Sequence, residues 1–183
     1  PFNLTASPAA PRGRQVKLAV LFSANGATQA ETLTVNLGTK HSSDPQGPDA
    51  YGYYCYDNTD NNYVQKPTYN WVEIDPSFGG TGTQLSINDP SENFYMSVLV
   101  NLPFSFGYYV HSTDQITVCS NGWLSTVANV SFSDFRNYPI PSAVGPYAMI
   151  APFWDDLITW SGGHVCSWYD AANHRFIVEW SRM

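Results

Sequence analysis

The stretch that decides the fold is QITVCSNGWLS (115–125), followed by NYPIPSAVGPYAMIAPFWDDL (137–157). Its first part alternates apolar and polar residues, with Ile116 and Val118 on one side, and ends at a Ser-Asn-Gly-Trp turn. A loop rich in proline and glycine follows, and a second apolar run closes in Phe-Trp-Asp-Asp. Period-two alternation punctuated by Gly and Pro predicts short strands joined by tight turns.

The same pattern of short alternating runs extends over most of the chain. Between 15 and 37, two alternating runs flank Asn25-Gly26, which predicts a β-hairpin. A strand-like run also closes at 71–74, and we expect further strands at 95–101, 104–110, 115–119, 122–127, 147–153, 164–169 and 175–181. The sequence therefore predicts an all-β fold: an antiparallel β-sandwich of jelly-roll or immunoglobulin-like type with an N-terminal β-hairpin.

A polar segment rich in Pro and Gly at 39–50 is the best candidate for a linker. We interpret 1–38 as the terminal hairpin of a preceding immunoglobulin-like domain, or as an N-terminal extension. Residues 51–183 are then the sandwich module. Because the last strand-like run stops just before Met183, we expect the chain to be part of a longer polypeptide.

Composition excludes several classes of function. Charged residues make up 13% of the chain, about half the usual ~25%, which suits the polar faces of exported β proteins. The net charge is −7 and basic residues form no run, so we expect no nucleic-acid partner. No stretch of about 18 apolar residues is present, so we expect no membrane span.

An acidic, amide-rich segment at 57–62 is a candidate calcium site. Asp57 and Asp60 lie within it, and Asp49 and Glu73 flank it. Calcium prefers several oxygen ligands from a turning backbone, and these four carboxylates are the candidate ligands. The alternative is a solvated turn in which the carboxylates accept backbone N–H groups. No other cofactor is expected.

Aromatic residues make up 15% of the chain, and some of them are candidates for binding sugars. Trp123 and Trp160 neighbour glycine-containing turns, and Tyr53 and Tyr56 lie in a tyrosine cluster, so we expect these four to be exposed and available for stacking on a glycan. The alternative is that the rings fill the core of the sandwich.

No catalytic constellation emerges from the polar residues. Asp155 and Asp156 are adjacent, so in a strand their side chains point to opposite faces. The histidines are scattered without HxxxH spacing, and Cys119 lies in an alternating strand, where thiols are usually inert. We expect no catalytic residues and no enzymatic activity in this chain.

Three motifs together resemble the nidogen-like extracellular domain, over about residues 45–183. They are ITVCSNGWL (116–124), YPIP (138–141) and MIAPFWDDL (149–157). The resemblance is closest to a β module of large secreted bacterial proteins, often beside gingipain-type or subtilisin-type peptidase domains. There the segments at 47–74 and 169–182 also have counterparts.

This resemblance implies a non-catalytic accessory module of a secreted or surface multidomain protein. Its expected roles are adhesion, spacing or substrate docking, with flanking domains of the same polypeptide as partners. One alternative is a carbohydrate-binding module that takes a polysaccharide or surface glycan. Another is an accessory fragment of a secreted cysteine or serine peptidase.

The three cysteines allow one disulfide in an oxidising compartment, or three buried thiols. Cys55 and Cys166 stand where the nidogen-like pattern usually has other residues. The resemblance thereby implies that these two pair with each other and that Cys119 remains a buried thiol.

Overall fold

The computed structural model describes residues 1–183 except 1–2, 8–9, 11, 92–93 and 132. It divides into two compact units, Pro1–Asn70 and Trp71–Met183. Nearly all of its regular structure is β-strand, in antiparallel sheets, so the prediction of an all-β sandwich with an N-terminal hairpin is confirmed. Within the described residues, no helix has the length and apolar character needed to cross a bilayer.

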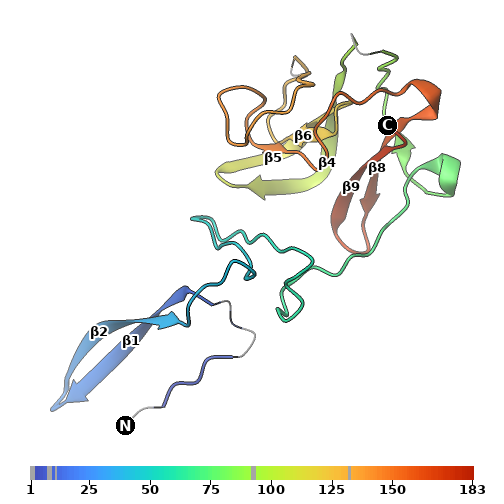
Figure 1. Ribbon diagram of the computed structural model, residues 1–183. Coiled ribbons are helices and arrows are strands. Elements are labelled where there is room, and N and C mark those ends of the chain that lie inside the picture. The colour runs from blue at the N-terminus through green and yellow to red at the C-terminus, as the bar shows by residue number, and fades with distance from the viewer. Residues whose placement is uncertain (1–2, 8–9, 11, 92–93, 132) are drawn as a thin grey trace. The chain divides into compact units, whose positions relative to one another are not determined.

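The first unit is built on the predicted hairpin. Strand β1 (Arg14–Ala24) pairs with β2 (Ala27–Leu37) across a two-residue turn (Figure 1). Asn25 and Gly26 both have positive φ, 50° and 80°, as a type I′ turn requires. Residues 38–70 contain no strand among those described, apart from an isolated bridge between Gln46 and Cys55. That the hairpin ends an earlier immunoglobulin-like domain stays a prediction.

The second unit contains two sheets (Figure 1). One has four strands in sequence order, and the other has three strands with β8 at its centre. The first consists of β4 (Ser97–Tyr108), β5 (His111–Cys119), β6 (Trp123–Ser125) and β7 (Met149–Ile150). The second consists of β3 (Thr83–Gln84), β8 (His164–Asp170) and β9 (Arg175–Ser181), and short 3-10 turns lie at Pro76–Phe78 and Trp160–Gly162.

The core lies between these two sheets. A buried cluster joins Val100 of β4 and Ile116 and Val118 of β5 to Val165 of β8. Trp180 of β9 packs against this cluster, and its indole Nε1 donates to the carbonyl oxygen of Cys119 at 2.7 Å. Period-two alternation places these side chains on the inner faces, which is why the sequence pattern identified the architecture.

Within the motif-rich stretch, the turn at Asn121 and Gly122 lies against the loop at 153–157. Gly122 has φ +74°, and a Cβ at this position would overlap the carbonyl oxygen of Phe153. The backbone oxygen of Asn121 accepts from Asp155 N, and its side-chain oxygen accepts from Leu157 N. The Asn-Gly pair is therefore required by the close approach of the Phe-Trp-Asp-Asp segment.

Four of the expected strand runs differ from the strands in the structure. The runs 95–101 and 104–110 form one strand, β4, with an irregular register between Asn101 and Phe106. The run 147–153 is a strand only at 149–150, since Pro152 cannot donate to a ladder. The run 71–74 is not a strand: the N–H of Ile74 donates to the buried carboxylate of Glu179 at 2.9 Å.

Candidate functional site

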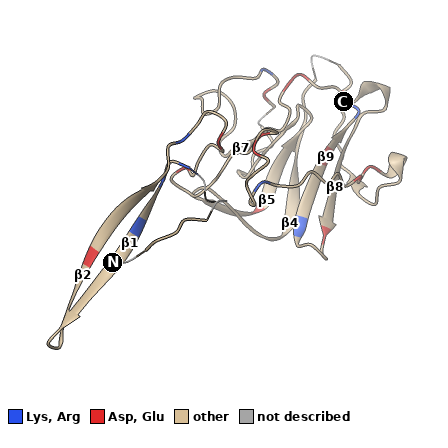
Figure 2. Ribbon diagram, turned by 60° about the horizontal axis from the view of Figure 1, so that its bottom comes forward, with Lys and Arg blue, Asp and Glu red and all other residues tan. Residues whose placement is uncertain are grey.

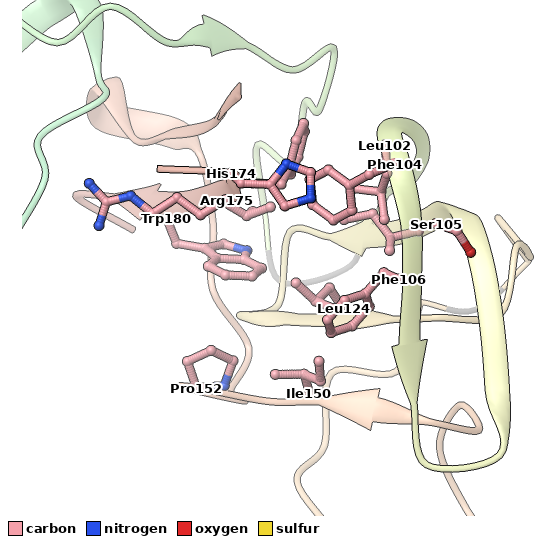
Figure 3. Close-up of a pocket in the computed structure, with 13 residues that line it drawn as sticks. Leu102, Phe104, Ser105, Phe106, Leu124, Ile150, Pro152, His174, Arg175 and Trp180 are labelled. Atoms are coloured by element: carbon pink, nitrogen blue, oxygen red, sulfur yellow. The ribbon is translucent and has the colours of Figure 1, made fainter. Parts of the chain in front are cut away.

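A cavity of about 530 Å³ lies between the two sheets of the second unit. The four-stranded sheet contributes Leu102 and Phe106 of β4, Leu124 of β6 and Ile150 of β7. Figure 3 shows Leu124 and Ile150 directed into this space from the side opposite Trp180. The volume is in the range of about 300–1,000 Å³ found for ligand pockets.

The opposite wall of the cavity belongs to β9. Phe176, Val178 and Trp180, at alternate positions of this strand, all line it. Arg175 is a lining residue at the rim, but its guanidinium points away from the cavity in Figure 3, and its Nε bonds Asp170 Oδ2 at 2.8 Å. The interior is therefore almost entirely apolar and suits an apolar occupant.

A second hollow, of about 770 Å³, lies in the first unit and is lined by tyrosines. We call it the tyrosine hollow. Tyr54 and Tyr56 both line it, with ring centroids 6.0 Å apart. The hydroxyl of Tyr54 is buried without a hydrogen-bond partner among the described residues. Its further lining residues are Asp57, Asn58, Asn61, Tyr63, Val64, Lys66, Pro67, Thr68 and Tyr69.

The four predicted sugar-stacking residues differ in accessibility. Trp160 is 64% exposed and Tyr53 is 42% exposed, as expected. Tyr56 is half-buried in the tyrosine hollow. The expectation for Trp123 was wrong: it is fully buried, and its Nε1 donates to the carbonyl oxygen of Asp134 at 2.8 Å. The turn before Trp123 lies against the 153–157 segment, and this directs the indole into the core.

Two of the predicted calcium ligands accept backbone N–H groups within turns. Asp49 Oδ1 accepts from the N–H groups of Tyr51 and Tyr53, at 2.8 and 3.0 Å. Asp57 Oδ1 accepts from the N–H and hydroxyl of Thr59, at 2.7 and 2.6 Å. These bonds hold the pKa of the Asp57 carboxyl below its usual range.

The other two predicted ligands have similar roles. Asp60 Oδ2 accepts from Asp57 N at 2.7 Å, while its buried Oδ1 has no partner among the described residues. Glu73 belongs to the second unit and accepts from Asp75 N at 2.8 Å. Within the described part of the chain, no three His, Cys, Asp or Glu residues form a metal-binding group. In the first unit, Asp57 and Asp60 share one turn and Asp49 is held by another, as the alternative of a solvated turn predicts, and calcium binding is left to experiment.

The cysteines are all free thiols, so the structure does not contain the Cys55–Cys166 disulfide that the resemblance implied. Cys55 is exposed in the first unit. Cys166 is fully buried on β8, and burial raises the pKa of its thiol to about 11. Cys119 is also fully buried, and burial raises the pKa of its thiol. A protonated, inaccessible thiol is a poor nucleophile.

Lys and Arg are scattered among Asp and Glu along the described part of each unit. Figure 2 shows the basic and acidic positions as separate short bands, without a continuous basic stretch in the described part of the chain. Asp155 and Asp156 are held locally, with Asp155 Oδ1 accepting from Asp156 N at 2.9 Å. Residues 155 and 156 lie outside any strand, so the expectation that they alternate between the two faces of a strand does not apply to them.

Sequence reasoning missed two features of the second unit. The first is the sandwich cavity, although the alternation of Phe176, Val178 and Trp180 already indicated an apolar face on β9. The second is the buried carboxylate of Glu179. The neighbouring sequence gives no indication that this side chain is buried. Burial, and then the charge of nearby Glu73, raise the pKa of Glu179, while the bond from Ile74 N partly offsets them.

A comparison with known protein families finds a match that covers the second unit and the last residues of the first. The sequence model of a family described as "NIDO related" matches residues 63–183. No curated protein and no solved structure matches the chain. The match covers most of the chain and both sheets of the sandwich, and it confirms the resemblance to the nidogen-like module. The chain therefore belongs to the NIDO-related family.

Proposed function

We propose that this chain is a non-catalytic accessory module of a secreted or cell-surface multidomain protein, and that it docks a partner through the sandwich cavity. The observation that carries the proposal is the apolar cavity between the sheets. Apolar lining left in contact with water is unfavourable, at roughly 25 cal/mol for each Å². A partner that covers this lining gains that free energy as binding energy, which suits adhesion or substrate docking better than catalysis.

A fluorescent apolar dye tests whether the cavity accepts an occupant. The full chain is expected to bind 8-anilinonaphthalene-1-sulfonate with enhanced emission while native. Phe176→Asp is expected to weaken this binding at least tenfold, because the new carboxylate points into the cavity. Ile177→Asp is the matched control, since alternation places this side chain on the opposite face of β9.

Two further measurements make the test decisive. Ile150→Trp fills the cavity without adding charge, and it is expected to reduce dye binding in a chain whose circular dichroism is unchanged. The isolated chain is also expected to hydrolyse neither casein nor polysaccharides. Equal dye binding by the folded cavity variants and the wild-type chain contradicts docking at this cavity, and measurable hydrolysis contradicts the non-catalytic assignment.

Carbohydrate binding is the second candidate function, and the tyrosine hollow favours it. Four tyrosine rings together with asparagine and aspartate side chains offer both stacking surfaces and directional hydrogen bonds. The unpartnered Tyr54 hydroxyl points to a polar ligand. Exposed Trp160, in the second unit, is a separate candidate for stacking.

A polysaccharide pull-down with the full chain tests this candidate. Tyr56→Ala and Tyr69→Ala are each expected to reduce retention at least tenfold, because each removes a ring from the hollow. Tyr147→Ala is the control, since Tyr147 is 72% exposed and lies in the second unit. A glycan array without any signal, or equal losses for all three variants, contradicts sugar binding at the hollow.

A further inference from the structure

The two sheets of the sandwich have unequal numbers of strands. The four-stranded sheet faces a sheet of three strands, in which β9 is at one edge. Among the described residues, no strand pairs with the other edge of β9. The cavity is lined by β9 on one side and by Leu124 of β6 and Ile150 of β7 on the other (Figure 3). The apolar side chains of β6 and β7 therefore lie where the smaller sheet has no strand to cover them.

The hydrogen bonds of β8 reveal which backbone groups of β9 face this open edge. The carbonyl oxygen of Val165 accepts from Leu85 N at 2.8 Å, so it is directed away from β9. Val165 is paired with Trp180, and in an antiparallel ladder such a pair exchanges no backbone hydrogen bonds. The N–H and C=O groups of Trp180 thus point to the free edge.

The backbone groups of every second residue of β9 point to the free edge, as those of Trp180 do. Val178 and Phe176 have the same parity as Trp180, so their backbone groups also point to the free edge. Ile177 and Glu179, in contrast, direct their backbone groups toward β8. Phe176, Val178 and Trp180 are also the β9 residues whose side chains line the cavity. Open backbone positions and cavity-lining side chains therefore belong to the same three residues.

We propose that the occupant of the cavity is an extended polypeptide segment that adds to β9 as a fourth, antiparallel strand. This proposal rests on the proposed docking function and names its partner. The segment has an apolar residue at every second position. Residues opposite Phe176, Val178 and Trp180 share their face of the sheet, so the apolar side chains of the segment enter the cavity. In the structure, none of the described strands occupies this edge of β9.

The nature of the site favours a peptide strand over a small apolar molecule. An apolar molecule uses only the side chains of the lining. A strand also uses the row of backbone donors and acceptors on β9, and these main-chain bonds supply affinity while alternate side chains supply specificity. The segment is uncharged where it enters the cavity, because an unpaired buried charge is strongly unfavourable.

The experiment adds a synthetic strand to the full chain. The peptide acetyl-Lys-Thr-Val-Thr-Leu-Thr-Val-Lys-amide carries three apolar residues at alternate positions. It is expected to displace the bound dye, and a peptide of the same composition with its apolar residues consecutive is expected to compete at least tenfold less well. N-methylation of the three apolar residues removes the donors that face β9, so it is expected to abolish binding. N-methylation of the threonines, whose N–H groups face outward, is expected to leave binding intact.

Hydrogen exchange followed by NMR reports on the backbone amides of β9. These amides are not protected when an occupant contacts only the side chains of the cavity. On peptide binding, the amides of Phe176, Val178 and Trp180 are expected to exchange at least tenfold more slowly. The amides of Ile177 and Glu179 already bond β8 and are expected to change little. Val178→Asp is expected to abolish both effects, while Ile177→Asp, on the other face, retains them in a chain with an unchanged thermal melt.

Each other outcome overturns this inference in a recognisable way. Dye displacement that is insensitive to N-methylation, without new amide protection, means that the cavity takes an apolar molecule; docking then stands and strand addition fails. Protected amides before any peptide is added, in a chain that is dimeric by light scattering, mean that a second copy covers the edge. Absence of dye binding itself means that the docking function fails together with this inference.

Discussion

The indole Nε1 of Trp180 donates to the carbonyl oxygen of Cys119 at 2.7 Å and so joins the edge strand of one sheet to the end of β5 in the other. This bond crosses the interior beside the cavity, which the Trp180 ring also lines. A buried carbonyl that loses its donor suffers the desolvation cost of an unsatisfied group. Trp180 therefore both lines the cavity and holds its walls together.

Replacement of Trp180 by Phe tests this role. The variant loses the hydrogen bond and part of the ring, and it is expected to be less stable by about 1–3 kcal/mol. Urea unfolding followed by tryptophan fluorescence measures the difference, because all six tryptophans lie in the second unit. Trp160→Phe is the control, since this ring is 64% exposed, and its stability is expected to change by less than about 0.5 kcal/mol. Equal stabilities for the two variants contradict the role of the bond.

Gly122 is expected to tolerate no side chain. Its positive φ and the nearness of the Phe153 carbonyl both exclude a Cβ, so Gly122→Ala is expected to cost about 4 kcal/mol or more, or to prevent folding of the second unit. Gly79 has a similar φ of +88°, but nothing lies within 4 Å of the position that a Cβ would occupy there. Gly79→Ala therefore isolates backbone strain, at about 1–2 kcal/mol. If both variants melt at the same temperature, the close approach is not what requires Gly122.

The pH dependence of stability is expected to depend on Glu179. Burial and the charge of Glu73 raise the pKa of Glu179 in the folded state above its unfolded value of about 4.3. The protonated form is thus favoured by folding, and this stabilisation is lost as the pH rises through the folded pKa. As the pH rises above about 4.3, the free energy of unfolding of the second unit is expected to decrease until the pH passes the folded-state pKa of Glu179.

Glu179→Gln separates this effect from other titrations. The amide oxygen of glutamine still accepts from Ile74 N but carries no charge, so the variant is expected to show a flatter pH profile and higher stability at pH 8. Asp170, in contrast, has its pKa lowered by hydrogen bonds from Asn173 and Arg175, and that contribution is lost only as the pH falls below about 4. Identical slopes for wild type and variant above pH 5 contradict the assignment to Glu179.

Thiol labelling distinguishes free cysteines from the Cys55–Cys166 disulfide. Native protein is expected to react with Ellman's reagent at one thiol, Cys55, because Cys119 and Cys166 are fully buried. The raised pKa of Cys166, about 11, further suppresses its thiolate at pH 8. All three thiols are expected to react in guanidinium chloride. A single reactive thiol in denaturant, located at Cys119 by mass spectrometry, establishes the disulfide.

Removal of calcium is expected to leave the melting temperature unchanged. Asp49, Asp57 and Asp60 use carboxylate oxygens to accept backbone N–H groups, and the described residues contain no group of three or more His, Cys, Asp or Glu that could hold a metal ion. A ligand that binds only the folded state raises its stability. Differential scanning calorimetry in EDTA and in millimolar calcium measures this directly, and a rise in the first unit's transition with calcium restores the calcium site.

Period-two alternation predicted the hairpin and β9 with nearly correct bounds. Both have a polar and an apolar face, and the hairpin also has the Asn-Gly turn that its two-residue connection requires. The same reasoning failed for 71–74, where Ile74 bonds a glutamate more than a hundred residues away instead of a strand. Such long-range partners leave no local pattern in the sequence.

The site was less predictable than the fold. Trp123 and Trp160 both neighbour turn residues, yet one is fully buried and the other is 64% exposed. The difference arises because the turn before Trp123 is covered by the 153–157 segment, a contact that spacing does not reveal. The cavity likewise depends on the unequal number of strands in two sheets, which is a property of pairing and not of any one segment.

The bare edge of β9 also bears on how the protein behaves at high concentration. Native sheets usually blunt an exposed edge with proline, a bulge or an inward charge, because an open row of N–H and C=O groups is a template for self-association. Residues 175–181 contain no proline, and their pairing with β8 is regular throughout. Two copies of the chain are therefore expected to pair through this edge into a closed dimer at high concentration, and a strand seated on β9 would prevent that self-association.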